Sequence, residues 1–181
     1  MGLGVGNWEW LAVGRWSLGV EVMSIDSRTL RHTVGRFATG VTVIAMELDG
    51  EIRAMTANSF TSLSLDPPLV LFCLGKETKA GLLVHESPGF SVSILSHTQR
   101  DLSSYFAGLW RDPAPPPFTF VDWDGGPRLE GCVAAMGCRT HAIHEGGDHW
   151  IVVGHVIATY RDEEAGEPLV FFGGRYVTLG T

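Results

Sequence analysis

Apolar positions along the chain gather into short runs that turn-forming residues separate, a pattern typical of a protein built mainly from strands. The run from Val41 to Leu48 is followed by Asp49-Gly50, which favours a two-residue hairpin turn, so residues 52–59 should return antiparallel beside it. The run from Leu69 to Leu74 is apolar throughout and predicts a buried strand. Further strands are expected at 90–95, at 132–144 and 149–160 (a long hairpin around a turn at 145–148), and at 168–172.

Short helices are predicted between these strands. Asp26 has the position of an N-cap for the first helix, which Gly40 should end, and Thr78 has that position for the second. Ser96 and Gln99 have capping-box spacing at the start of a third. The helices are too few for a doubly wound sheet, and no Gly-x-Gly-x-x-Gly follows a strand. A closed or partly open antiparallel barrel therefore fits better than a Rossmann fold.

The segment from Met55 to Pro68 interrupts the strand pattern, because small polar residues run through it almost unbroken before a double proline. It begins with hydrogen-bonding side chains and one residue small enough to leave space for a flat ring: Thr56, Ala57, Asn58 and Ser59. We interpret these four residues as a strand end that faces a flat group with polar edges. We interpret Ser64–Pro68 as the turn that leads into the next strand.

A second polar segment, Gly75–Lys79, follows the buried strand and carries Lys76, Thr78 and Lys79 at a predicted helix start. Hydroxyl groups, backbone N–H groups and positive charge at such a position suit a phosphate. The two segments together predict a site that holds a ring at one end and its phosphate at the other. An ordinary polar loop followed by a capped helix is the alternative interpretation.

Two strand ends that contain glycine are further candidates for a ligand-binding site, because a ligand can approach the backbone closely beside glycine. They are Gly146–His149 and Gly173–Tyr176. A solvent-exposed histidine and a tyrosine used for packing are the alternative interpretations. Cys132, Cys138, His141 and His144 are residue types that bind zinc, but the spacing of the two cysteines is not that of a zinc knuckle, so no metal site is predicted.

Composition restricts the class of protein. The 181 residues suit one domain, and 45% hydrophobic against 18% charged residues indicates a globular protein. The formal net charge of −7 argues against a nucleic-acid partner. No apolar run is long enough to cross a bilayer, so no membrane partner is expected. Cys73, Cys132 and Cys138 make no even disulfide framework, and reduced, buried thiols in a cytoplasmic protein are expected.

The first 22 residues are rich in glycine and tryptophan, and they lack the basic start, apolar block and cleavage site of a secretory signal. Met23-Ser24 directly precedes the first predicted helix. We therefore expect an N-terminal extension at 1–22 that is dispensable, followed by one domain at 23–181. An amphipathic arm that packs on a partner subunit is the alternative interpretation of residues 1–22.

Five segments occur in an order that resembles a known family. They are Phe37–Val43, Met55–Val70, Phe90–Leu95, Gly147-Asp148-His149 and Glu167–Tyr176. Their sequences resemble those of the flavin reductase-like domain, the short-chain NAD(P)H:flavin oxidoreductases that serve two-component monooxygenases. The resemblance covers most of the chain from Ser24 onward.

The resemblance implies a mainly β fold, an FMN-binding split barrel of Greek-key, antiparallel type with a few short helices. It also implies a homodimer with the flavin, FMN or FAD, near the subunit interface. Thr56, Ala57, Asn58 and Ser59 would border the isoalloxazine ring. Cys73, Lys76, Thr78 and Lys79 would lie along the ribityl chain and phosphate. His149 would lie near the nicotinamide of NADH or NADPH, and Tyr176 would line the flavin pocket.

The activity that the resemblance implies is hydride transfer from a nicotinamide to a flavin. The cofactors carry that chemistry, so no catalytic side chain is expected, and the protein's task is to stack two rings in a near-attack geometry. The reduced flavin would leave to serve a large oxygenase component. One alternative is a non-catalytic flavin- or haem-binding split barrel that acts as a sensor or carrier, and another is a dimer module without a ligand. Gly147-Asp148-His149 favours the enzyme.

Overall fold

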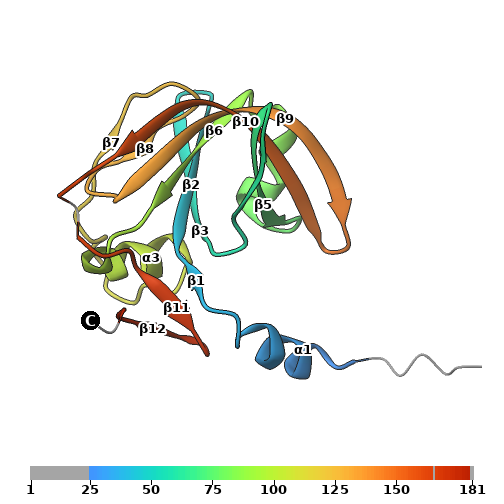
Figure 1. The fold of residues 1–181 in the computed structure, drawn as a ribbon, viewed down its shortest axis with the longest axis vertical. Coiled ribbons are helices and arrows are strands. Elements are labelled where there is room, and N and C mark those ends of the chain that lie inside the picture. The colour runs from blue at the N-terminus through green and yellow to red at the C-terminus, as the bar shows by residue number, and fades with distance from the viewer. Residues whose placement is uncertain (1–24, 165, 180–181) are drawn as a thin grey trace, which may run out of the picture.

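The computed structural model describes residues 25–164 and 166–179 (Figure 1). The expectations for residues 1–22 lie outside the described residues. The largest sheet has seven antiparallel strands in the order β3-β2-β6-β9-β10-β5-β4. Its strands are β2 (Thr42–Leu48), β3 (Glu51–Ala57), β4 (Thr61–Leu65), β5 (Pro68–Gly75), β6 (Gly89–Ile94), β9 (Ala134–Gly146) and β10 (His149–Arg161). The predicted mainly β, antiparallel barrel with a few short helices is confirmed.

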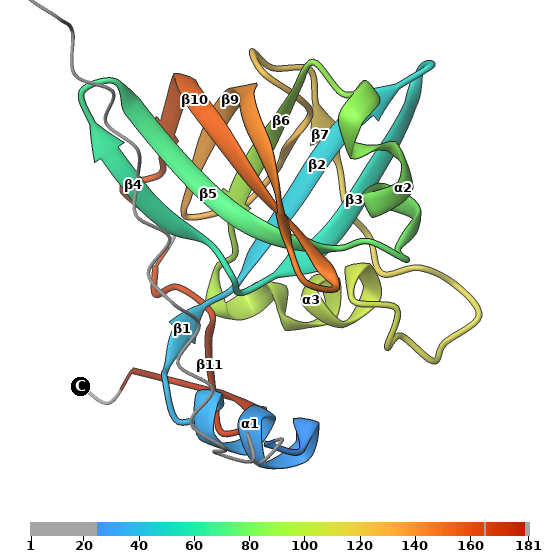
Figure 2. The same cartoon turned by 90° about the vertical axis from the view of Figure 1, so that its right-hand side faces the viewer.

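The two edge strands of this sheet, β3 and β4, are consecutive in the chain, and residues 58–60 join them. Figure 2 shows the sheet folding over on itself, so that β3 and β2 face β5 and β4. The barrel therefore has one seam, where the end of β3, residues 58–60 and the end of β5 meet. The polar segment found in the sequence crosses this seam.

Local turn chemistry accounts for the hairpins that the sequence predicts. Asp49 and Gly50 have positive φ angles of 53° and 75°, as a type I′ turn requires, and β2 pairs antiparallel with β3. β9 and β10 form the long hairpin, with Gly147 at φ 71° in its turn. The turn is shorter than expected, because β9 continues to Gly146.

Helix α1 (Ser27–Val34) begins where the sequence predicts but ends earlier. The Asp26 carboxylate accepts the backbone N–H groups of Arg28 (2.9 Å) and Thr29 (3.1 Å), so the N-cap is confirmed. The predicted end at Gly40 is wrong. Gly40 lies in β1 (Thr39–Gly40) and pairs with Val170 of β11 (Val170–Phe172), an extended pairing that a helix running to Gly40 would prevent.

The other two predicted helix starts are confirmed. Thr78 caps α2 (Lys79–Leu83), and the short 3-10 turn η1 (Val84–Glu86) follows it. Ser96 and Gln99 form a reciprocal capping box at η2 (His97–Gln99), which leads into α3 (Arg100–Phe106). Because α3 lies against β2 and β3, it covers the end of the barrel beside the seam.

The sequence analysis missed β4 and β12 (Arg175–Val177), besides three strands of two residues each. The interpretation of Ser64–Pro68 as a turn is wrong in part, because β4 extends to Leu65. Leu63 and Leu65 are exposed, as are Thr61 and Ser62, so this edge strand has no buried apolar face to signal it. The strand β12 has only three residues, too few to show an alternation, and pairs with β11 after the Gly173-Gly174 turn.

Two buried clusters hold the barrel together. One fills its interior, with Phe72 against Phe90 edge to face at a centroid distance of 5.0 Å. The other lies under α3 and includes Val43 of β2 and Leu102 of α3. The three cysteines are free, but only Cys132 and Cys138 are buried, and Cys73 is half-buried. A short pair, β7 (Phe120–Val121) and β8 (Arg128–Leu129), completes the described strands.

Candidate functional site

The seam is fastened by the side chain of Ser59. Its hydroxyl donates to the carbonyl oxygen of Cys73 (3.0 Å) and accepts the N–H of Cys73 (3.1 Å). These two bonds replace the ladder that β3 and β5 do not form with each other at this point. The hydroxyl is thus committed to the backbone of β5, while Asn58 beside it is exposed.

Thr56 and Tyr176 meet through one residue of α3. The Thr56 hydroxyl donates to the carbonyl oxygen of Ser103 (2.7 Å), and the Ser103 hydroxyl lies 2.9 Å from the Tyr176 hydroxyl. Ser103 is fully buried, and Thr56 and Tyr176 are half-buried. The structure therefore ties the end of β3 to the C-terminal strand β12, which places two predicted site residues in one hydrogen-bonded chain.

The tip of the β9–β10 hairpin lies against the turn between β5 and α2. His149 pairs with Gly75 across β10 and β5, and the backbone N–H of Lys76 donates to the carbonyl oxygen of Asp148 (3.0 Å). The Lys76 ammonium lies 4.5 Å from the centre of the Trp150 ring and 3.5 Å from Glu145. Two segments about seventy residues apart in sequence are therefore brought together at one end of the barrel.

His149 is half-exposed and held by its neighbour. Its Nδ1 lies 2.8 Å from an Asp148 carboxylate oxygen. The hydrogen bond from His149, and then the charge of its ring, lower the pKa of the Asp148 carboxyl below its ordinary value. An ionised Asp148 accepts from Nδ1–H, so the imidazole is oriented with Nε2 directed away from the carboxylate. This arrangement suits a positioning role for His149.

The side chains of the predicted phosphate segment, residues 75–79, lie in different surroundings in the structure. The Thr78 hydroxyl donates to the Gly75 carbonyl oxygen (2.8 Å) and accepts the N–H of Gly81 (3.0 Å), so the turn itself uses it. Lys76 lies against the β9–β10 hairpin, whereas Lys79 lies on the other side of the turn and lines a pocket with β3. The two lysines therefore do not converge on one point.

Two cavities flank the site. One, of about 630 Å³, is bordered by α1, the seam and the β11–β12 turn, and the predicted residues Asn58 and Ser59 line it. Its other walls are largely apolar side chains: Val34, Phe37, Phe60 and Phe171. The open apolar faces of this cavity suit one face of a flat ring.

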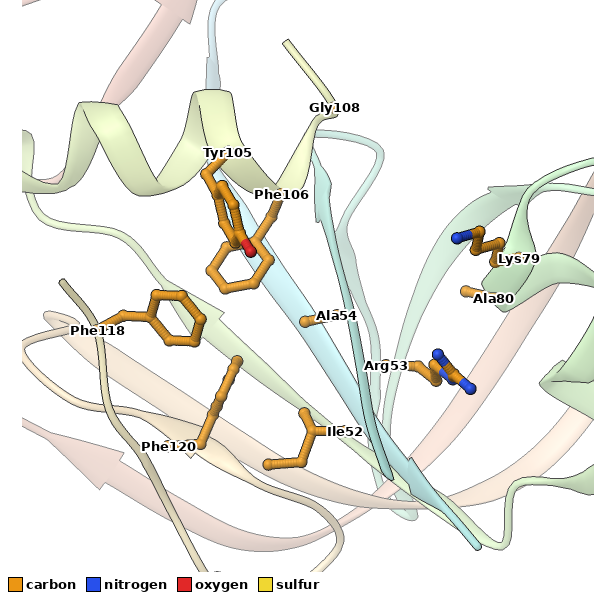
Figure 3. A pocket seen from close by; sticks show the side chains of 10 residues that line it. All are labelled: Ile52, Arg53, Ala54, Lys79, Ala80, Tyr105, Phe106, Gly108, Phe118 and Phe120. Atoms are coloured by element: carbon orange, nitrogen blue, oxygen red, sulfur yellow. The ribbon is translucent and has the colours of Figure 1, made fainter. Parts of the chain in front are cut away.

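The second cavity, of about 610 Å³, is the one that contains Lys79 (Figure 3). We call it the aromatic–cationic pocket. It is lined by ten residues: Ile52, Arg53, Ala54, Lys79, Ala80, Tyr105, Phe106, Gly108, Phe118 and Phe120. Sequence reasoning missed all of these except Lys79. The sequence showed an arginine in a predicted strand and two phenylalanines near a proline-rich stretch at 113–117, but nothing in it placed them together.

The residues present fit a flavin. Exposed Asn58 offers amide groups at the seam, and the guanidinium Nε of Arg53 is buried without a hydrogen-bond partner among the described residues. Oxygen atoms of a bound phosphate or ring satisfy such groups. Within residues 25–164 and 166–179, no three His, Cys, Asp or Glu side chains are grouped as metal ligands, and no helix is long and apolar enough to cross a membrane.

The fold and these residues define a split-barrel protein with open cavities beside its seam. Comparison with known families identifies the family of this chain. The family described as flavin reductase like domain matches residues 34–180. The chain belongs to this family. It is a flavin reductase, an oxidoreductase that transfers hydride from a nicotinamide nucleotide to a flavin.

Several characterised proteins are similar over most of their length. An NADH-dependent FAD reductase of Streptomyces globisporus is 43% identical over 156 residues, which are 83% of this chain and 85% of that protein. The reductase subunit HsaB of a flavin-dependent monooxygenase of Rhodococcus jostii is 37% identical, over 88% of this chain and 82% of that protein.

Solved structures of the family superpose well on this chain. The flavin reductase PheA2 matches with a TM-score of 0.81 and 38% identity, over 87% of this chain and 100% of that one. An NADH:FAD oxidoreductase of Streptomyces globisporus, solved in complex with NAD and FAD fragments, matches with a TM-score of 0.77 and 39% identity, over 86% and 93% of the two chains. The resemblance drawn from five sequence segments is thereby confirmed.

Proposed function

We propose that this flavin reductase uses NADH, reduces a flavin that it binds reversibly, and supplies the reduced flavin to a separate oxygenase component. The observation that carries the proposal is the convergence at the seam: the β9–β10 hairpin brings His149 beside the turn that follows β5, while Ser59 joins that strand to the end of β3. Similarity to an NADH-dependent FAD reductase and to a monooxygenase reductase subunit supports the choice of donor and partner.

The proposed roles follow from what each side chain touches. A bound flavin would supply the redox chemistry, acceptance of hydride from a nicotinamide, which needs stacking and not a protein acid or base. Thr56, Ala57, Asn58 and Ser59 border the ring, and the hydrogen bonds of Thr56 and Ser59 to Ser103 and Cys73 keep that border rigid. A rigid border would favour the separation that such a transfer needs, about 3–3.5 Å between the reacting atoms.

His149 positions the nicotinamide in this proposal. Asp148 holds its Nδ1, so Nε2 is the nitrogen presented to a ligand. Cys73, half-buried at the seam, and the Lys76, Thr78 and Lys79 turn remain the proposed border of the ribityl chain and phosphate. Because Thr78 uses its hydroxyl within the turn, the attraction for phosphate comes from the charges of Lys76 and Lys79, each on its own side of the turn.

The proposed unit is a homodimer. Helix α1 buries none of its residues, and Leu30, Val34 and Phe37 are 53%, 60% and 76% exposed. Val34 and Phe37 also line the cavity at the seam, so the apolar surface and the predicted ring site are continuous. Contiguous exposed apolar surface of this kind is typical of an interface, and a second copy of the chain would cover it and wall the flavin.

One assay tests the activity. The protein is mixed with FMN or FAD and with NADH or NADPH, and nicotinamide oxidation is followed by absorbance in all four pairings. We expect oxidation that depends on added flavin and is faster with NADH than with NADPH. No flavin-dependent oxidation in any pairing would leave a non-catalytic flavin- or haem-binding barrel as the better description. A flavin that co-purifies and does not exchange would contradict delivery to an oxygenase.

A further inference from the structure

The aromatic–cationic pocket has two chemically different walls (Figure 3). Tyr105 and Phe106, at the end of α3, form the aromatic wall with Phe118, from the loop before β7, and Phe120, the first residue of β7. Arg53 of β3 and Lys79 of α2 lie on the opposite side of the same cavity. The pocket volume, about 610 Å³, lies within the range of small-molecule sites.

The aromatic wall is a continuous platform. Each of its rings contacts at least two others, with centroid distances from 5.1 Å (Tyr105–Phe106) to 5.8 Å (Phe106–Phe120). Phe106 and Phe120 also pack on the cluster under α3, which anchors the platform. Phe118 is 38% exposed, so one large apolar ring is open toward the pocket. Such rings stack flat heteroaromatic bases, at about 1–3 kcal/mol per base.

The cationic wall has an N–H donor and a positive charge that no described residue satisfies. One terminal nitrogen of Arg53 contacts the Glu51 carboxylate, but its Nε is buried and has no hydrogen-bond partner among the described residues. Lys79 is exposed and forms no ion pair with any described side chain. A buried, unsatisfied guanidinium N–H is costly, and a phosphate oxygen is the acceptor that arginine geometry suits best. In a chain of net charge −7, two cations at one pocket are not a general surface property.

A platform for a flat base beside a pair of cations is the recognition chemistry of a nucleotide. We infer that the aromatic–cationic pocket binds an adenosine phosphate group, with the base on Phe118 and the phosphate at Arg53 and Lys79. This inference rests on the proposed function, since FAD and NADH both carry that group and FMN does not. The inference adds to the proposed function a pocket that selects nucleotides carrying this group. The pocket lies beside the ring site, and its residues play no part in hydride transfer.

The test measures binding directly in the full chain. ADP is titrated by calorimetry into the wild-type protein and into the variants Phe118→Ala and Arg53→Gln. The matched control is Arg161→Gln, which removes an exposed arginine of β10 and the same charge. Dissociation constants for FAD and FMN, from quenching of flavin fluorescence, and the KM for NADH are measured on the same four proteins.

The expected result is that ADP binds the wild type and the control equally, and that each pocket variant binds it about 10-fold more weakly. Weaker FAD binding with FMN binding unchanged identifies the group as that of FAD. A raised KM for NADH with FAD binding unchanged identifies it as that of NADH.

Two results overturn the inference: no ADP binding by a wild type that still binds flavin, and equal ADP affinity in all four proteins. Absence of flavin binding and of nicotinamide oxidation in the wild type would instead refute the proposed function. The ADP titration can still be interpreted in that case. Failure of the pocket inference and failure of the proposed function are therefore distinguishable. Circular dichroism melts of the four proteins show whether a pocket variant has lost its fold, and Tyr105→Leu then replaces Phe118→Ala as the platform variant.

Discussion

The hydroxyl of Ser59 is hydrogen-bonded to both backbone groups of Cys73, to the oxygen at 3.0 Å and to the nitrogen at 3.1 Å. This pair of bonds fastens the link between β3 and β4 onto β5, at the one place where the barrel's sheet does not close by its own ladder. The polar segment of the sequence therefore has a structural task at the seam, in addition to the ring-binding task that we propose for it.

Ser59→Ala should loosen the seam. The substitution leaves the N–H and carbonyl oxygen of Cys73 without their partner, which costs about 1–2 kcal/mol of unfolding free energy. Flavin affinity should fall as well, because the border of the ring site becomes mobile. Urea denaturation and flavin fluorescence measure the two effects. Ser62→Ala, on the exposed edge strand β4, is the matched control, and equal behaviour of the two variants would contradict the role of Ser59.

His149→Ala should raise the KM for NADH several-fold while changing flavin affinity little, because His149 is proposed to touch the nicotinamide and not the flavin. Steady-state kinetics and flavin titration separate the two quantities. His144→Ala removes an exposed imidazole from β9, on the same hairpin, and should change neither. Equal losses of NADH and flavin binding in the His149 variant would argue against a positioning role.

The carboxyl of Asp148 should titrate at lower pH in the wild type than in His149→Ala, since the hydrogen bond and charge of His149 depress its pKa. A depressed carboxyl pKa stabilises the folded state above the unfolded value, 3.8, and this contribution disappears as the pH falls through the folded value. The Asp148 carboxylate is exposed to solvent, so the effect of the pairing on stability should be small. Carboxyl carbon NMR shifts follow the titration, and an unchanged midpoint in the variant would exclude the pairing in solution.

The three thiols should differ in reactivity. Burial raises the pKa of the Cys138 thiol to about 12 and also raises that of Cys132, so neither forms thiolate near neutral pH. With a thiol reagent, the native protein should release one equivalent, from half-buried Cys73, and the denatured protein three. Added flavin should slow the native reaction if Cys73 borders it. Rapid release of all three equivalents from native protein would contradict the burial of Cys132 and Cys138.

Val34→Glu should convert a dimer into a monomer, because it places a charge in the exposed apolar surface of α1 beside the seam cavity. Light scattering after size-exclusion chromatography measures the mass, and flavin titration should show weaker binding in the monomer. His32→Glu changes an exposed position on the same helix that does not line the cavity, and should stay dimeric. A monomeric wild type would refute the proposed homodimer.

The sequence by itself determined the parts of this protein that depend on neighbours along the chain. The Asp49-Gly50 hairpin, the Asp26 and Thr78 caps and the Ser96–Gln99 capping box are bonds between residues a few positions apart, and each occurs where the sequence predicts it. The order of five segments was also enough to recognise the family. Where the local signal was weak, as in the exposed edge strand β4 and the three-residue β12, the prediction failed.

Only the tertiary structure decided which distant residues share a site. Ser59 meets Cys73 14 positions on, Thr56 reaches Ser103 47 positions on, and Ser103 reaches Tyr176 73 positions on. The same folding brings Arg53 to the pocket of Phe118. These contacts depend on how the sheet curls and where α3 lies against it. Strand register and helix docking are set by burial summed over the whole core, and no short stretch of sequence carries that sum.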